Sequence, residues 1–317
     1  MKTFELNSGD EIPVLGLGTW KMTSEVAAEA VAAAINAGYR HIDGAWIYDN
    51  ESGVGAGIKK GCEDSGLTRD DVWITSKLWN DRHRPELVGE ALKTSLQLLN
   101  VEQLDLFLIH WPVVHQPGVI RPEDASGFVS LEEVPLADTW QAMEECVKQG
   151  LCKNIGVSNF SVKKLKDLKS KAQIQPAVNQ VECHPYLPQN ELHNYCLENN
   201  IRLTAYSPLG SGDRPDFLKK DDEPSLFNDT TLGEVANEKS VSVAQVLLAW
   251  AMQRGTIPIP KSASPKNQKA NLAAAELELS ADDMKRIDTI NKPYRFVDGS
   301  FWEREGGPYT VANIWDE

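Results

Sequence analysis

Four polar residues in the front half of the chain have side chains that could deliver a proton to a carbonyl oxygen: Asp43, Tyr48, Lys77 and His110. Asp43 ends the segment YRHID, Lys77 ends DVWITSK and His110 ends LDLFLIH, and each segment is typical of a buried strand. Tyr48 lies just past the first of these strand ends. Because buried Asp and Lys side chains are usually paired, strands that repeatedly end in such groups indicate one shared site.

The chemistry that these residue types permit is the reduction of an aldehyde. Hydride adds to the carbonyl carbon, and a donor must supply a proton to the oxygen. A free Tyr, with a pKa of about 10, is a poor acid, but a nearby cation makes the phenol a better donor. Lys77 can supply that charge, Asp43 can hold Lys77, and His110 can orient and polarise the carbonyl.

Each of the four residues also has an ordinary structural explanation. A lone Tyr or His beside a strand is usually structural, and Asp43 with Lys77 could be only an ion pair at the rim of a sheet. Four such groups at successive strand ends favour a functional site.

The elements that would position these residues alternate between strand and helix. After a candidate hairpin (TFELN, SGD, EIPVL), strands are predicted at 15–20, 39–44, 72–78, 104–111, 152–158, 177–182, 201–207 and 256–261. Helices are predicted at 24–38, with a Ser24 cap and a Gly38 stop, and at 84–100, 136–150, 161–170, 187–200, 231–255 (two helices), 267–278 and 280–291.

Eight such units predict an α/β fold, a (β/α)8 TIM barrel with an N-terminal β-hairpin, as a single domain over residues 1–317. A doubly wound open sheet is the alternative, but the first strand offers only GLGTWKM as a weak glycine signal for it. Long segments at 112–137, 208–228 and 293–317 contain aromatic residues and are predicted to be ordered lids over the C-terminal face of the barrel.

Composition narrows the possible partners and the compartment. A net charge of −14 argues against nucleic acid and anionic membranes as partners. The sequence has no run of about 20 apolar residues, as a membrane helix would need, and its start lacks the apolar core of a signal peptide. Five cysteines without a CxxC pair favour reduced thiols in a cytoplasmic protein. Cys183, His184, His193 and Cys196 are close in sequence, but their spacing fits no common zinc pattern, so no metal is expected.

At this point the chain resembles the aldo-keto reductase superfamily, and within it the aldose and aldehyde reductases. The motifs are GLGTW (16–20), GYRHIDGAWIYDNE (38–51), ITSKLW (74–79), LIHWP (108–112), GVSNF (156–160), QPAVNQVECHPY (175–186), AYSPLG (205–210) and IPIPKS (257–262). The resemblance implies a (β/α)8 barrel and NAD(P)H-dependent carbonyl reduction. It also implies that Tyr48 is the proton donor, Lys77 lowers its pKa, Asp43 supports Lys77 and His110 orients the substrate.

The resemblance assigns a cofactor site as well. Ser158, Asn159 and Gln180 are suited to gripping a carboxamide, and Tyr206 can stack on the nicotinamide. The remaining cofactor residues that it implies are Ser207, Leu209, Ser211 and Asp213 near the pyrophosphate, Lys261 and Ser262 at the 2′-phosphate, and Asn271 near the adenine.

Three positions depart from the family pattern. Asn267 stands where an Arg often pairs with the 2′-phosphate, Ala270 where a Glu is common, and Gly44 where Thr is common. Lys266 and Lys269 flank Asn267 and can compensate in part. We therefore expect NADPH to be used, with weaker discrimination against NADH.

Aromatic residues at strand ends and in the long segments predict an apolar substrate pocket. The candidates are Trp20, Trp46, Trp79, Trp111, Phe128 and Trp302, with Phe301 beside the last, whereas Trp73, Trp140 and Trp250 are expected in the core. Such a pocket suits aromatic or aliphatic aldehydes and sugars stacked on a ring.

The function expected from the residues and the resemblance is NADPH-preferring aldehyde reduction. One alternative is an NAD(H)-preferring alcohol or sugar dehydrogenase of the same family, and another is a non-catalytic nucleotide-sensing barrel. Either a monomer or a homodimer is compatible with the sequence.

Overall fold

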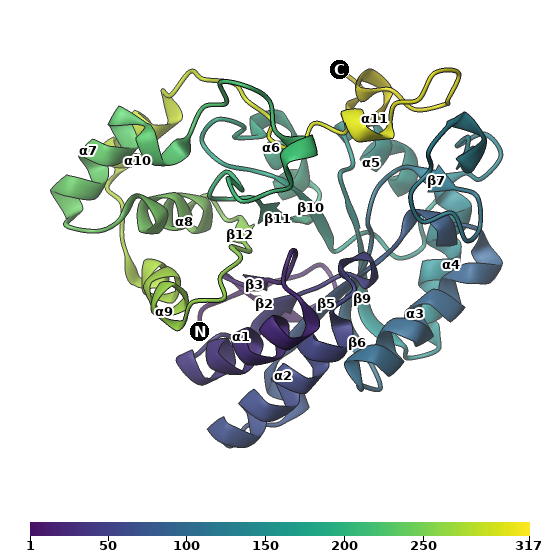
Figure 1. Ribbon diagram of the computed structural model, residues 1–317, viewed down its shortest axis with the longest axis horizontal. Helices are drawn as coiled ribbons and strands as arrows, with labels where there is room; N and C mark the ends of the chain where they lie inside the picture. The colour runs from purple at the N-terminus through teal and green to yellow at the C-terminus, as the bar shows by residue number, and fades with distance from the viewer.

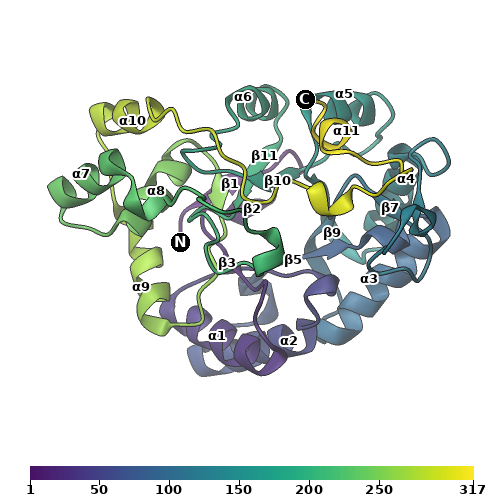
Figure 2. The same ribbon diagram turned by 45° about the horizontal axis from the view of Figure 1, so that its top comes forward.

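Eight parallel strands form a closed ring at the centre of the molecule, and helices surround it (Figure 1, Figure 2). The computed structural model describes residues 1–317, except for the side chain of Phe217. Neighbouring strands follow the order β3, β4, β5, β6, β9, β10, β11, β12. A parallel bridge between Gly18 and Lys261 joins the two end strands, and Gly18 N donates to Pro260 O at 3.2 Å. The predicted (β/α)8 barrel is confirmed.

Each strand of the ring lies inside a segment predicted to be a strand. The strands are β3 (Leu17–Gly18), β4 (His41–Asp43), β5 (Trp73–Leu78), β6 (Leu104–Ile109), β9 (Cys152–Ser158), β10 (Val178–Glu182), β11 (Arg202–Tyr206) and β12 (Ile257–Pro258). The predicted hairpin is also present, as β1 (Thr3–Glu5) paired antiparallel with β2 (Glu11–Pro13). Its Leu6 and Ile12 pack against the inner face of the ring, so the hairpin closes the end opposite the strand carboxyl ends.

The helices fill the connections between strands. They are α1 (Ser24–Ala37), α2 (Glu51–Ser65), α3 (Pro85–Leu99), α4 (Leu136–Lys148), α5 (Val162–Lys169), α6 (Asn190–Glu198), α7 (Thr230–Lys239), α8 (Val243–Gln253), α9 (Pro265–Ala273) and α10 (Ala281–Asp288). Gly38 ends α1 with a φ of 116°, as predicted, but the cap of α1 is Thr23 rather than Ser24. The Thr23 hydroxyl accepts from Val26 N, and because Thr and Ser are both good caps the pair TS does not reveal which one starts the helix. No described helix is long and apolar enough to cross a membrane.

Helix α2 was not predicted, because glycine is a poor helix former and α2 contains Gly53, Gly55, Gly57 and Gly61. The structure explains why glycine is needed there. A Cβ at Gly53 would lie 1.9 Å from Ser24 O of α1, and a Cβ at Gly55 would lie 2.2 Å from Leu99 O of α3. The glycines therefore let α2 pack with its backbone directly against its neighbours.

Replacing Gly55 by alanine should therefore destabilise the protein, although alanine favours helices. The new methyl group would meet backbone, which cannot move aside cheaply, so we expect a loss of about 3 kcal/mol in the free energy of unfolding. Gly89→Ala in α3 is the matched control, since nothing lies within 4 Å of that Cβ, and it should gain about 0.5–1 kcal/mol. Urea unfolding of both variants measures the contrast, and an equal effect of the two substitutions would contradict this packing account.

The three long segments lie together above the carboxyl ends of the strands, where Figure 2 shows the tail running beside the segment around β7. Residues 112–137 contain the short strands β7 (Val114–His115) and β8 (Phe128–Val129), and the tail ends in α11 (Val311–Trp315). The Tyr309 hydroxyl accepts from Val114 N at 2.8 Å and donates to Val129 O at 2.6 Å. The tail therefore holds both short strands in place.

Candidate active site

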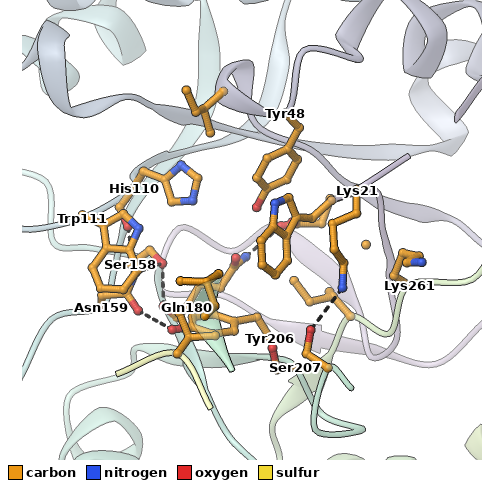
Figure 3. A pocket seen from close by; sticks show the side chains of 18 of the residues that line it. Lys21, Tyr48, His110, Trp111, Ser158, Asn159, Gln180, Tyr206, Ser207 and Lys261 are labelled. Atoms are coloured by element: carbon orange, nitrogen blue, oxygen red, sulfur yellow. Dashed lines mark hydrogen bonds between the residues drawn. The ribbon is translucent and has the colours of Figure 1, made fainter. Parts of the chain in front are cut away.

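A cavity of about 550 Å³ opens at the carboxyl ends of the strands and beneath the long segments. Residues from several strand ends line it, among them Asp43 and, as Figure 3 shows, Ser158, Gln180 and Tyr206. Because parallel strands all end on this face, residues far apart in the sequence meet here.

A buried ion pair lies beside Tyr48, and its Asp43 member lines the cavity. Lys77 Nζ donates to Asp43 Oδ1 at 2.6 Å and to Gly44 O at 2.8 Å. Lys77 and Asp43 are 1% and 2% exposed, so their charges depend on each other for compensation. A Cβ at Gly44 would make only ordinary contacts, so nothing in the structure explains glycine there.

Tyr48 and His110 both face the cavity above this pair (Figure 3). The Tyr48 hydroxyl lies 3.4 Å from Lys77 Nζ, and the rings of Tyr48 and His110 meet edge to face with centroids 5.8 Å apart. Tyr48 is carried by the short helix η1 (Trp46–Tyr48), which directly follows β4. The structure thus brings together all four residues of the predicted catalytic set.

Burial raises the pKa of Tyr48, and the Lys77 charge acts in the opposite direction. The phenol is therefore held in its protonated, donor form, while Lys77 lessens the cost of losing the proton. Burial and then the Lys77 charge keep the pKa of His110 well below its usual value. His110 is accordingly neutral at physiological pH, so it can donate a hydrogen bond but is not an acid.

Polar side chains on the neighbouring strand ends connect the predicted cofactor residues to this set. Gln180 Nε2 donates to Asp43 Oδ2 at 2.7 Å, and Ser158 Oγ donates to Gln180 O at 2.7 Å. Asn159 Nδ2 donates to His110 O at 2.9 Å, and the Tyr206 hydroxyl donates to Asn159 Oδ1 at 2.9 Å. These contacts fix the orientation of the wall on which a nicotinamide ring would rest.

A second ionic contact, which joins residues from three different loops, lies at the cavity away from the Lys77–Asp43 pair. Asp213 lies between Lys21 Nζ, at 2.5 Å from Oδ1, and Lys261 Nζ, at 2.6 Å from Oδ2. Burial alone would raise the pKa of Asp213, but the two lysines outweigh it and lower the pKa to about 2. Lys21 also donates to Ser211 Oγ at 3.2 Å. Lys21 was not predicted as a site residue, because nothing in the sequence around it indicates a partner in another long segment.

Some of the other predicted cofactor residues line the cavity, and others lie outside it. Ser207, Leu209 and Lys261 line the cavity, whereas Ser262 and Asn271 do not. Ser262 Oγ lies against Ser264 O at 3.3 Å, and Asn271 is buried on α9. An adenosine phosphate held by these two residues would therefore lie outside the cavity, beside α9.

Aromatic side chains make the remaining wall. Trp20, Trp79, Trp111 and Trp302 line the cavity as predicted, together with Phe301. Trp46 and Phe128, also predicted for the pocket, do not reach it. Trp46 packs, partly buried, against the cluster that contains Trp79, Trp111 and Trp302. Phe128 lies behind the wall, with its ring centroid 5.7 Å from that of Tyr309.

The cysteine and histidine residues considered as metal ligands do not form a site among the described residues. His184 Nε2 lies 2.7 Å from Glu182 Oε1 and is fully buried. The Glu182 carboxylate also accepts from Phe296 N and Val297 N, so this pair anchors the beginning of the tail.

The cavity holds together the groups that a nicotinamide cofactor and a carbonyl substrate need. Tyr206 offers an aromatic face, Gln180 and Asn159 offer polar atoms, and the contact of Asp213 with Lys21 and Lys261 crosses the opening. The residues present therefore fit the cofactor that the sequence led us to expect.

Comparison with known proteins agrees with this geometry. The family model described as "Aldo/keto reductase family" matches residues 14–292. The chain is 50% identical to "Aldo/keto reductase slr0942" of Synechocystis, over 100% of this chain and 97% of that protein. It is 44% identical to "Aldo-keto reductase family 1 member A1" of Xenopus tropicalis, over 92% of this chain and 89% of that protein. The solved aldose reductase of Schistosoma japonicum superposes with a TM-score of 0.87 at 35% identity, over 95% of this chain and 96% of that one.

The family model covers most of the chain, and these relatives align along nearly its whole length. The chain therefore belongs to the aldo/keto reductase family, a family of oxidoreductases that use nicotinamide cofactors.

Proposed function

We propose that this protein is an NADPH-preferring aldehyde reductase in which Tyr48 is the proton donor and which works as a single barrel domain. The observation that carries the proposal is the Tyr48 hydroxyl, which faces the cavity 3.4 Å from the ammonium of a buried Lys77–Asp43 pair. A phenol in that position is protonated in the resting enzyme, and the adjacent cation stabilises the phenolate left after transfer.

Each residue of the set has one task in this reaction. The bound nicotinamide supplies the hydride. Tyr48 gives its proton to the carbonyl oxygen, and neutral His110 donates a hydrogen bond that orients that oxygen. Asp43 holds Lys77, and Gln180, which donates to Asp43, links the cofactor wall to the pair. The aromatic wall excludes water from the reacting atoms.

The preference for NADPH follows from charges near the start of α9. Lys261 lies at the cavity edge, and Lys266 and Lys269 are exposed on α9, with no ion pair to a described residue. Three cations favour a ligand with a 2′-phosphate. Asn267, which is exposed between Lys266 and Lys269, has no charged group that could bind the 2′-phosphate in a bidentate way. We therefore expect the preference for NADPH over NADH to be moderate.

Asn267 also motivates the second candidate, a dehydrogenase that prefers NAD and oxidises alcohols or sugars. Steady-state kcat/KM with NADPH and NADH, measured in both directions over a panel of aldehydes and their alcohols, separates the two candidates. We expect reduction with NADPH to be preferred and Asn267→Arg to increase that preference by about tenfold. A preference for NADH of about tenfold or more would contradict the cofactor assignment. Binding of NADPH without reduction of any aldehyde would instead support the non-catalytic barrel.

A further inference from the structure

Two of the long segments border different parts of the cavity. Residues 208–228, called the cofactor segment from here on, carry Asp213, which we expect beside the pyrophosphate of the cofactor. The tail carries Phe301 and Trp302 of the aromatic wall on the substrate side. The two segments are also joined directly to each other, and these contacts lie outside the set of residues that the reaction uses.

A first group of contacts between the two segments is centred on Glu223. Its carboxylate binds the buried Arg214 within the cofactor segment and accepts from the Tyr294 hydroxyl of the tail at 2.9 Å. The Arg214 guanidinium in turn lies over the ring of Phe296 in the tail, 5.2 Å from the ring centroid. Because Arg214 directly follows Asp213 in the chain, these contacts hold that part of the cofactor segment against the beginning of the tail.

A second link joins Lys220 of the cofactor segment to Asp298 of the tail. Lys220 Nζ lies 2.5 Å from Asp298 Oδ2, and Lys220 makes no other ion pair with a described residue. Asp298 Oδ1 accepts from Ser300 N at 3.0 Å and from Ser300 Oγ at 2.7 Å, and Asp298 O accepts from Trp315 Nε1 at 2.7 Å. Burial alone would raise the pKa of Asp298, but the hydrogen bonds from Lys220 and Ser300 outweigh it and lower the pKa. The tail therefore presents a charged carboxylate in a fixed position to Lys220.

Neither Lys220 nor Asp298 lines the cavity, but residues next to each of them do. Leu218 lies two residues before Lys220, and Val297 comes immediately before Asp298, and both line the cavity. The Lys220–Asp298 contact therefore helps to set where the cofactor segment lies relative to the substrate wall. It can act on a bound ligand only through that placement.

We propose that Asp298 is a positioning residue for the cofactor, which through Lys220 holds the cofactor segment in the position that covers the bound nucleotide. This inference rests on the proposed function and adds a link between the cofactor side and the substrate side of the cavity. Such coupling is reciprocal at equilibrium, so bound NADPH should also hold the tail, with Phe301 and Trp302, in the position that receives the aldehyde. Neither side chain touches the reacting atoms, so the chemical step itself should not depend on them.

The test measures the Kd and the dissociation rate of NADPH, from the quenching of protein fluorescence, in Asp298→Asn and Lys220→Met. Both variants should bind NADPH about three- to fivefold more weakly and release it faster, which is the size expected for a pair whose side chains are 62% and 21% exposed. The double variant should be no weaker than either single one, because each side chain acts through the other. Lys220→Arg keeps the charge and should stay within about twofold of wild type. The single-turnover rate of reduction from the preformed NADPH complex should also change by less than about twofold.

The direction of the Asp298→Asn effect separates this inference from simple electrostatics. Removing a negative charge should by itself tighten the binding of an anionic cofactor, whereas losing the link to Lys220 weakens it. Asparagine also keeps an oxygen that can accept from Ser300, so the local structure of the tail is retained.

Lys219→Met is the matched control, because Lys219 is the neighbouring lysine but pairs with Asp216 inside the cofactor segment, at 3.0 Å. It removes the same charge without touching the tail and should leave the Kd of NADPH within about twofold of wild type. An Asp298→Asn protein that binds NADPH as tightly as wild type, or a Lys219→Met protein weakened as much as Lys220→Met, overturns the inference and leaves the reductase proposal intact. A wild-type protein that does not bind NADPH would instead count against the proposed function.

Discussion

Replacing Lys77 by methionine should abolish reduction and lower the free energy of unfolding by about 3–5 kcal/mol. Methionine fills a similar volume but removes the cation, which leaves the Asp43 carboxylate buried with Gln180 as its remaining side-chain donor. An uncompensated buried charge is expensive, so the cost exceeds what the ion pair itself contributes. Activity should be lost because nothing then stabilises the Tyr48 phenolate.

Two variants separate these effects. Lys77→Met combined with Asp43→Asn removes both charges, so stability should largely return while activity does not. Lys153→Met is the matched control. Lys153 also pairs with an aspartate, Asp105, at 2.9 Å, but its side chain is 39% exposed, and Asp105 keeps a second ion pair with Arg69. It should cost less than about 1 kcal/mol. Urea unfolding and aldehyde reduction are measured on all three proteins, and a Lys77→Met protein as stable as Lys153→Met would refute the buried-pair account.

The barrel was predictable because its signals are local. Each strand is a short apolar run followed by a helical pattern, and the resemblance to the aldo-keto reductases rests on motifs such as GLGTW and LIHWP. The catalytic set was predictable for the same reason, because Asp43, Lys77 and His110 each close such a run. Parallel strands then place all their ends on one face.

Features that depend on contacts between distant segments were not predictable. The glycines of α2 argue against a helix in the sequence, because glycine is a poor helix former. They are needed because the backbone of α2 packs closely against α1 and α3, which the local sequence does not show. Lys21 has no local mark of its role, since its partner Asp213 lies 192 residues further along the chain. Phe128 is an aromatic residue of the kind that lines the pocket, but it packs against Tyr309 and Trp302 and so lies behind the aromatic wall of the cavity.

We propose that Tyr48 supplies the proton, and Tyr48→Phe removes only the hydroxyl that would do so. The ring, its edge contact with His110 and the buried pair beneath it are retained. The lost contact with Lys77 is 3.4 Å long, so stability should change by less than about 1 kcal/mol. The reaction should nevertheless slow by about 1000-fold or more, because no other acidic side chain that lines the cavity is free to donate.

The most direct measurement is kcat/KM for aldehyde reduction by Tyr48→Phe and wild type, alongside the Kd of NADPH from the quenching of protein fluorescence. We expect a loss of about 1000-fold or more in kcat/KM, with a Kd that changes by less than about twofold. A Tyr48→Phe enzyme that keeps more than about a tenth of the wild-type kcat/KM, with NADPH bound equally well, would show that the proton comes from elsewhere.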